Sequence, residues 1–196
     1  MARPREFDER AVLDAAVQCF WGGGYEGTSL RELIDRTGLT GASIYNAFGD
    51  KRAFYRRALE HYLAGSIQVR LRRYETMAPR VALGRFFDDI LERSLADRER
   101  KGCMLVNAAL EVSSHDAQLQ GLVADMLSQI EAFFVERVSA GQLDGTIRST
   151  LPAADLARHL LAVLMGLRVL ARTCPQRERL QGAVSPALAL LDGAGA

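Results

Sequence analysis

The chain has 196 residues, 48% of them hydrophobic and 25% charged, which suits a globular protein with one medium domain or a small and a larger one. The formal net charge of +1 excludes a polybasic protein that binds nucleic acid through its overall charge. Three widely spaced cysteines indicate neither a disulfide framework nor a metal site, and we expect no cofactor. The N-terminus resembles no signal peptide, and no apolar run approaches the roughly 20 residues that span a bilayer, so we expect no membrane partner and a cytoplasmic location.

The first part of the chain predicts a basic arm followed by a helix. Arg3 and Arg5 lie in the arm, where they are placed to reach a DNA minor groove. Asp8 is a suitable N-cap for a helix that reaches about Trp21. The three glycines at 22–24 are expected to stop this helix.

Two short helices with a tight turn between them are predicted over residues 28–47. Thr28 is a good N-cap for the first, and Gly38 supplies the left-handed residue that ends it. Thr40 can cap the second helix, which has a polar face. This arrangement is the helix-turn-helix pattern, whose second helix enters a DNA major groove.

The remaining chain shows helical periodicity and no alternating strand pattern. The approximate ranges of its predicted helices are 50–74, 79–95, 103–112, 116–140, 152–173 and 177–191. The predicted fold is therefore all-α, with about nine helices. We expect a helix-turn-helix DNA-binding domain at 1–50 and a ligand-binding and dimerisation domain at 51–196.

Several short motifs in the first 60 residues occur together. They are Ala15–Ala16, Phe20, Gly24–Ser29, Thr37–Leu39, Ser43–Tyr45, Phe48 and Asp50–Lys51. With these motifs the segment resembles the DNA-binding domain of the TetR family of bacterial transcriptional regulators, and the rest of the chain resembles it in length and helical pattern. The piece Gly102–Glu111 resembles a subgroup in which some members sense electrophiles or oxidants. The resemblance implies a homodimeric repressor, released from a palindromic operator by a small-molecule or thiol-reactive effector.

The predicted recognition helix carries no charged residue, so its DNA contacts are expected from small and polar groups. The residues are Thr40, Gly41, Ala42, Ser43, Tyr45 and Asn46. Asn46 can pair with an adenine edge and Ala42 can touch a thymine methyl group. The helix that begins at Thr28 can direct its positive end at phosphate, and Lys51 is placed for a phosphate, as similar lysines are in the family. Arg31 and Arg36 are either phosphate contacts or solvated helix charges.

The helix predicted at 152–173 is apolar on more than one side, so its second side must be buried. A four-helix interface with the last helix and a partner's pair is the best account, and a core helix is the alternative. The predicted interface residues are Leu156, Leu160, Val163, Leu164, Leu167 and Leu188. Arg168 lies among leucines and is expected to pair with a carboxylate of the protein, or else of a partner or ligand.

The middle helices can enclose a cavity for an effector. Its candidate lining residues are Tyr62, Phe86, Phe87, Ile90, Cys103, Asn107, Leu110, Glu111, Met126, Ile130 and Phe133. Plain core packing explains most of these residues equally well. Asn107 and Glu111 are the polar members of a short apolar helix, although Glu111 also fits a surface or structural charge.

Cys103 is the candidate sensor residue. It follows Gly102 at a predicted helix start, with Arg98, Arg100 and Lys101 just before it. A helix N-terminus and nearby cations favour the reactive thiolate. The alternative is a small buried packing residue.

Two rival functions are an enzyme that uses the helical cavity and a helix-turn-helix scaffold that binds only protein. The three histidines, His61, His115 and His159, are scattered, and the chain contains no HExxH or GxSxG motif. We therefore expect a DNA-binding transcriptional regulator and not an enzyme, with double-stranded operator DNA, a second copy of itself and a small-molecule effector as partners.

Overall fold

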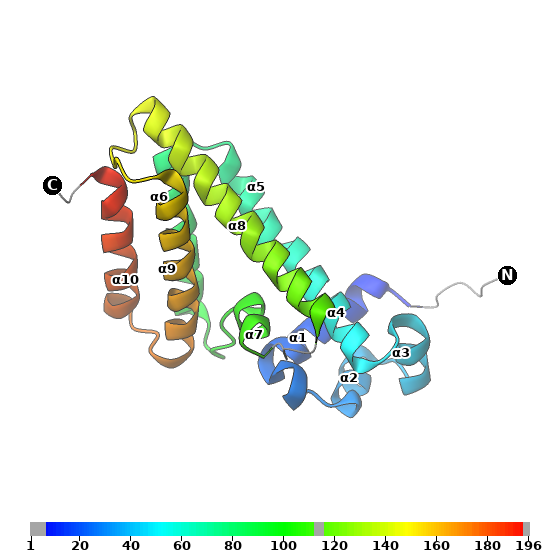
Figure 1. Ribbon diagram of the computed structural model, residues 1–196. Coiled ribbons are helices and arrows are strands. Elements are labelled where there is room, and N and C mark those ends of the chain that lie inside the picture. The colour runs from blue at the N-terminus through cyan, green and yellow to red at the C-terminus, as the bar shows by residue number, and fades with distance from the viewer. Residues whose placement is uncertain (1–6, 112–115, 194–196) are drawn as a thin grey trace. The chain divides into compact units, whose positions relative to one another are not determined.

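The computed structural model describes residues 7–111 and 116–193, and over these residues it is helical with no strand (Figure 1). The elements are α1 (Glu9–Gly27), α2 (Leu30–Thr37), α3 (Gly41–Phe48), α4 (Lys51–Tyr62), η1 (Leu63–Gln68), α5 (Val69–Glu75), α6 (Pro79–Ala96), α7 (Met104–Glu111), α8 (Ala117–Asp144), α9 (Ala153–Thr173), α10 (Arg177–Ala189) and η2 (Leu190–Asp192). The π-helical η1 joins α4 to α5 in one continuous helical run. The prediction of an all-α fold is confirmed.

The chain folds into two compact units. The described residues of 1–67 and 103–120 form the first unit, and those of 68–102 and 121–193 form the second. Among the described residues, no helix is long and apolar enough to cross a membrane.

In the first unit, α1 packs against α2, α4 and α7, and α3 packs against α2 and α4. Aromatic rings fill the core of this unit. Phe48, at the end of α3, stacks on Phe54 of α4 with 4.4 Å between ring centroids. Phe20 of α1 meets the edge of Tyr55 at 5.0 Å. These contacts fix α3 against α4 and leave its opposite face exposed.

The start of α2 differs from the sequence prediction. The helix α1 continues through Gly22 and Gly23 and kinks at Gly24, which has φ 70° and ψ −179°. Thr28 is fully buried, and its hydroxyl donates to the carbonyl oxygens of Gly24 and Cys19, at 2.7 and 3.2 Å. The N-cap is Ser29, whose hydroxyl accepts from the Glu32 N–H. The prediction that Thr28 caps the helix was therefore wrong, because the kink leaves carbonyl groups that bind the threonine.

Other predicted helix ends are confirmed. Gly38 is left-handed with φ 70°, and its N–H donates to the Ile34 carbonyl. Thr40 accepts from the Ser43 N–H, and Asp50 accepts from the Ala53 N–H at the start of α4. Pro79 opens α6 as predicted.

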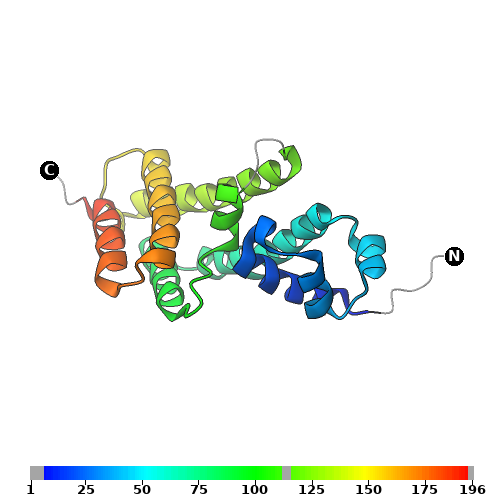
Figure 2. The same ribbon diagram turned by 90° about the horizontal axis from the view of Figure 1, so that it is seen from below.

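In the second unit, α6 packs against α5, α9 and α10, and α9 packs against α10. The two views of the ribbon show α9 and α10 side by side (Figures 1 and 2). Phe86 and Phe87 of α6 contact Phe134 of α8, at centroid distances of 5.2 and 5.9 Å. These rings form the centre of the second core.

Four of the leucines predicted at the dimer interface belong to this core. Leu156, Leu160, Leu164 and Leu167 are each at most 6% exposed within the single chain. Their burial agrees with the alternative prediction, in which this helix belongs to the core of a single chain. A partner would therefore contact other residues of α9. Val163 and Leu188 are half-buried.

Candidate nucleic-acid interface

The helix α3 presents an uncharged polar face held in place by two buried anchors. Ile44 and Phe48 are 1% and 7% exposed. Tyr45, one residue after Ile44, is 68% exposed, and Asn46 is also exposed. A surface tyrosine and amide on a firmly anchored helix can reach base edges and phosphates without a rearrangement of the unit.

The N-terminus of α3 is ordered by its own hydroxyl groups. The Thr40 and Ser43 hydroxyl oxygens lie 2.9 Å apart, and Thr40 also accepts from the Ser43 N–H at 3.1 Å. Thr40 and Ala42 are exposed, and Ser43 is half-buried. A Cβ on Gly41 would meet only the Ile34 side chain, at an ordinary 3.4 Å. Packing therefore does not require a glycine at 41, whereas close approach of a ligand to the helix would favour one.

Lys51 lies at the first position of α4 and is half-buried. Its ammonium group sits 4.5 Å from the centroid of the Tyr25 ring. Burial, aided by the Glu26 carboxylate, raises the pKa of Tyr25, so the ring partner stays neutral. The ring orients the lysine, and a cation–π contact leaves its N–H donors able to bind phosphate.

Two exposed arginines on α2, Arg31 and Arg36, make no ion pair with any described residue. Both therefore fit either prediction made from the sequence, a phosphate contact or a solvated helix charge. Thr28 has no exposed surface, so its side chain is not at the interface. Arg3 and Arg5 lie outside the described residues.

The arginines that follow Lys51 on α4 have partners within the first unit. Arg57 pairs with Glu9 at 2.8 Å, and Arg52 pairs with Asp116 at 2.5 Å. A hydrogen bond from Arg52 lowers the pKa of Asp116 below its usual value and more than offsets the effect of burial. Arg52 and Asp116 line a polar cleft of about 410 Å³, which also involves Asp50, Ala53, Arg56, Gln118 and Leu119.

The predicted effector residues of the first unit lie on or beside α7. The Tyr62 hydroxyl donates to the Cys103 sulfur at 3.6 Å, and Cys103 is only 9% exposed. Asn107 is buried, whereas Leu110 is 71% exposed. The Glu111 carboxylate accepts a hydrogen bond from the Tyr25 N–H at 2.9 Å. Glu111 thus has the structural role that the sequence offered as its alternative.

The predicted effector residues of the second unit are all buried. They are Phe86, Phe87, Ile90, Met126, Ile130 and Phe133, each at most 5% exposed. Phe86 lies 5.8 Å from Phe133 between ring centroids. These side chains pack as core in the structure described, and a role in effector binding stays a prediction.

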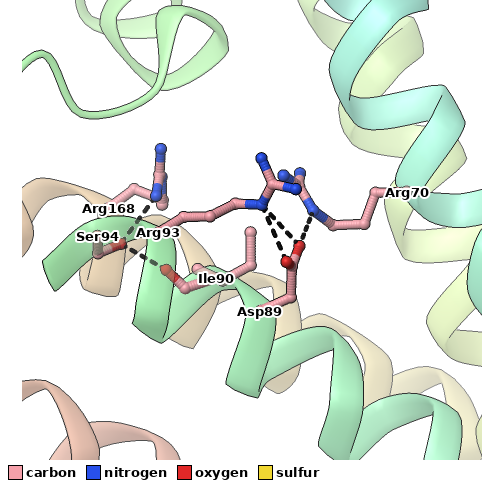
Figure 3. Close-up of polar contacts among 6 residues, drawn as sticks. All are labelled: Arg70, Asp89, Ile90, Arg93, Ser94 and Arg168. Atoms are coloured by element: carbon pink, nitrogen blue, oxygen red, sulfur yellow. Dashed lines mark hydrogen bonds and ion pairs between the residues drawn. The ribbon is translucent and has the colours of Figure 1, made fainter. Parts of the chain in front are cut away.

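Sequence reasoning missed one group of charged residues in the second unit. Arg70 on α5 and Arg93 on α6 both bind Asp89, which lies one helical turn before Arg93 (Figure 3). The i,i+4 spacing of Asp89 and Arg93 was a signal for this pair. Nothing in the sequence indicated that Arg70 would join them.

Two family descriptions match this chain. Residues 12–58 match "Bacterial regulatory proteins, tetR family", and residues 79–186 match "Tetracyclin repressor-like, C-terminal domain". The first match contains the helix-turn-helix and the start of α4. The second begins at α6 and ends within α10.

Individual relatives extend the likeness to almost the whole chain. The HTH-type transcriptional regulator YezE of Bacillus subtilis (strain 168), itself described as uncharacterised, is 31% identical over 98% of this chain and 100% of its own length. The HTH-type transcriptional repressor ComR of Escherichia coli (strain K12) is 26% identical over 91% of this chain and 86% of its own. Among solved structures, a cysteine mutant of the TetR family regulator CifR, complexed with 26 bp double-strand operator DNA, is 30% identical with a TM-score of 0.84, covering 97% of this chain and 100% of that one.

Proposed function

This chain belongs to the tetR family of bacterial regulatory proteins, and we propose that it represses transcription by binding a palindromic operator through α3. The family is one of transcriptional regulators and not of enzymes. The observation that supports the proposal most is the exposed, uncharged polar face of α3 above the buried anchors Ile44 and Phe48. Operator DNA bound to the similar protein CifR, and the repressor named ComR, support the same role. Such a repressor acts on the chromosome, so we propose a cytoplasmic location.

Each part of the interface has a separate task in this proposal. Asn46 and Ala42 read base edges, while Tyr45, Ser43, Thr40 and the backbone at Gly41 contact the DNA that flanks them. Lys51 neutralises a phosphate, and the N-terminus of α2, capped by Ser29, faces another. Residues 1–50 then act as the DNA-binding domain, and 51–196 as the domain for effector and partner.

A homodimer is part of the proposal because one recognition helix reads only a few base pairs. Two copies place their helices in major grooves one turn apart, about 34–36 Å. The exposed side of α9 offers a surface for the partner. It contains the small exposed residues Ala162 and Gly166, and also Val169 and Leu170, which are 41% and 40% exposed. Small residues let two helices approach closely, and the exposed aliphatic side chains supply apolar area.

An effector bound by the larger domain would favour a conformation in which the two recognition helices no longer match the operator. Cys103 is the residue that a thiol-reactive effector would modify. Its burial beside Tyr62 supports the packing alternative.

Selection of genomic fragments on the purified protein, starting with its own promoter region, tests the proposal. Recovery of a palindrome bound at a ratio of two chains per site is the expected result. Treatment with N-ethylmaleimide then separates the effector classes: loss of binding in the wild type but not in Cys103→Ser identifies a thiol sensor. Insensitivity to the reagent leaves the repressor in place and points to a noncovalent effector. Failure to select any sequence, with capture of a protein partner instead, would replace the repressor by an interaction scaffold.

A further inference from the structure

Arg168 of α9 is a buried cation that has no carboxylate partner among the described residues. Only 9% of it is exposed. Its guanidinium donates to the Ser94 hydroxyl at 2.8 Å and to the Gly102 carbonyl oxygen, which are both neutral acceptors. Its Nε is buried and has no hydrogen-bond partner in the part of the chain that is described. The expected pairing with a carboxylate of the same protein is therefore not what the structure contains.

An arginine cannot escape the cost of a buried charge by losing its proton, because a guanidinium stays protonated in proteins. A buried charge without a counter-charge is costly in free energy. Five N–H groups are available on a guanidinium, and two of them are occupied by Ser94 and Gly102. The remaining donors include the buried Nε, which is the kind of group that a planar anion satisfies with two parallel hydrogen bonds.

The charges nearest along α6 do not supply the missing negative group. Asp89 binds Arg70 through its Oδ2 at 2.8 Å and Arg93 through both oxygens at 2.9 and 3.0 Å (Figure 3). Its carboxylate is thus shared by two guanidinium groups already. Asp97, directly after α6, accepts from the Gly102 N–H at 2.8 Å and makes no ion pair with Arg168 among the described residues. Three arginines and two carboxylates leave an excess of one positive charge in this part of the second unit, and this excess attracts a small anion.

We propose that Arg168 anchors a binding site for a small organic anion, whose carboxylate or phosphate group pairs with the buried guanidinium. Ser94 holds the guanidinium in position, because its hydroxyl accepts from Arg168 while it donates to the Ile90 carbonyl at 2.7 Å. Arg93, which is 57% exposed, is the second cation that an anion would meet. The role of this anion as the effector rests on the proposed function, whereas binding of the anion does not.

A purely structural role makes a different prediction for the protein without ligand. If Arg168 serves mainly to join α9 to α6, its replacement by methionine removes two useful hydrogen bonds and lowers the melting temperature. If Arg168 serves an anion, the ligand-free protein carries an uncompensated buried charge. Replacement of such a charge by an apolar side chain of similar length is neutral or stabilising. The ligand-free melting temperature of Arg168→Met therefore discriminates the two roles.

The experiment uses the full chain as wild type, Arg168→Met, Arg168→Lys and the control Arg158→Met. Arg158 lies on the same helix but is exposed, and it pairs with Glu131 and Asp155. Melting temperature and calorimetric binding are measured with sodium acetate, benzoate, succinate and phosphate, each against sodium chloride at equal ionic strength. Comparison of the three carboxylates with phosphate shows which anion class the site accepts.

We expect saturable binding of at least one of these anions to the wild type and to Arg158→Met. Arg168→Met should weaken it by at least about tenfold, and Arg168→Lys should weaken it less, because lysine keeps the charge without the planar fork. The proposal is overturned if no anion stabilises the wild type beyond chloride, or if Arg168→Met binds as the wild type does. A ligand-free melting temperature of Arg168→Met that is lower by more than about 4 °C would also overturn it.

Operator affinity is measured separately with and without the bound anion. If the anion binds and operator affinity stays unchanged, the anion is not the effector, but the proposed binding site at Arg168 stands. Anion binding by a protein that selects no operator would contradict the proposed function alone.

Discussion

The Glu111 carboxylate at the end of α7 accepts a 2.9 Å hydrogen bond from the backbone N–H of Tyr25, directly after the kink in α1. The kink residue, Gly24, lies against the same carboxylate, because a Cβ at this position would be 2.5 Å from Glu111 Oε1. Gly24 also has φ 70° with ψ −179°, a conformation that is nearly restricted to glycine. Glu111 therefore fills the space that the missing side chain leaves, and it satisfies an N–H that the kink has freed.

Replacement of Gly24 by alanine is expected to destabilise the protein by about 2–4 kcal/mol, from backbone strain together with the contact with Glu111. Glu111→Ala alone should cost about 1 kcal/mol, since it removes one charge-assisted hydrogen bond near the surface. The double variant should be less destabilised than the sum, because alanine at 111 removes the steric part and leaves only the strain. Urea unfolding of the four proteins measures this coupling. Strict additivity would mean that the two residues do not interact as described.

Asn46→Ala and Lys51→Ala should weaken operator binding in different ways. A lost base contact costs about 1–3 kcal/mol and relaxes the preference at one base pair. A lost phosphate contact weakens binding to every sequence and reduces the slope of log affinity against log salt by about 1. Fluorescence anisotropy on the operator and on a variant at each base pair, over a range of salt, separates these effects. Equal losses on all sequences for Asn46→Ala would show that Asn46 does not read a base.

The first turns of the helix-turn-helix show what sequence reasoning could and could not decide here. Gly38 and Thr40 were assigned correctly, because each acts on the backbone within three or four residues of itself. Thr28 and Ser29 are both good caps in isolation. The choice between them depended on the kink at Gly24, whose carbonyl binds the threonine hydroxyl. Ser29 with Glu32 three residues later fits the capping-box pattern, which was the available signal for the correct cap.

The sequence could not show which apolar side of α9 is buried within the chain. Leu160 and Leu164 face the core of the chain, and Val169 and Leu170 are exposed, but all four have similar hydrophobicity. Periodicity shows that a helix has two apolar sides and does not show which one the same chain covers. Arg168 was visible as an unusual residue among leucines. Only the positions of Ser94 and Gly102, 74 and 66 residues away, reveal that its partners are neutral.

Acid should remove the contribution of Asp89 to stability. Burial alone would raise the pKa of Asp89, but hydrogen bonds from Arg70 and Arg93 hold it below the ordinary 3.8. A carboxyl group with a depressed pKa in the folded state stabilises the protein fully above its unfolded pKa, and this stability is lost as the pH falls through the folded value. Asp89→Asn should therefore be less stable than the wild type by roughly 1 kcal/mol at pH 6, since the pair is partly exposed. The difference should shrink below pH 4.

Urea unfolding between pH 6 and pH 2.5 measures this difference. Asp88→Asn is the matched control, because Asp88 is exposed and has no ion pair with a described residue. The free energy of unfolding of Asp88→Asn should equal that of the wild type at every pH. A constant gap between Asp89→Asn and the wild type would show that the carboxyl charge of Asp89 does not contribute.

Gly166 tests the surface of α9 that we propose for the dimer. Apart from the neighbouring backbone of α9 itself, no atom lies within 4 Å of a Cβ built at this position, so a side chain fits the single chain without strain. Glutamate also has a higher helix propensity than glycine, so Gly166→Glu should fold with unchanged or slightly higher stability.

In a dimer that packs through Ala162 and Gly166, however, the new carboxylates would be buried without partners and close to one another. We expect the variant to be monomeric at micromolar concentration by light scattering, with operator affinity lowered by at least about a hundredfold because the second half-site is lost. Gly121→Glu on α8, where the Cβ position is equally open, is the control and should remain dimeric. A dimeric Gly166→Glu that binds the operator normally would show that this side of α9 is not the interface.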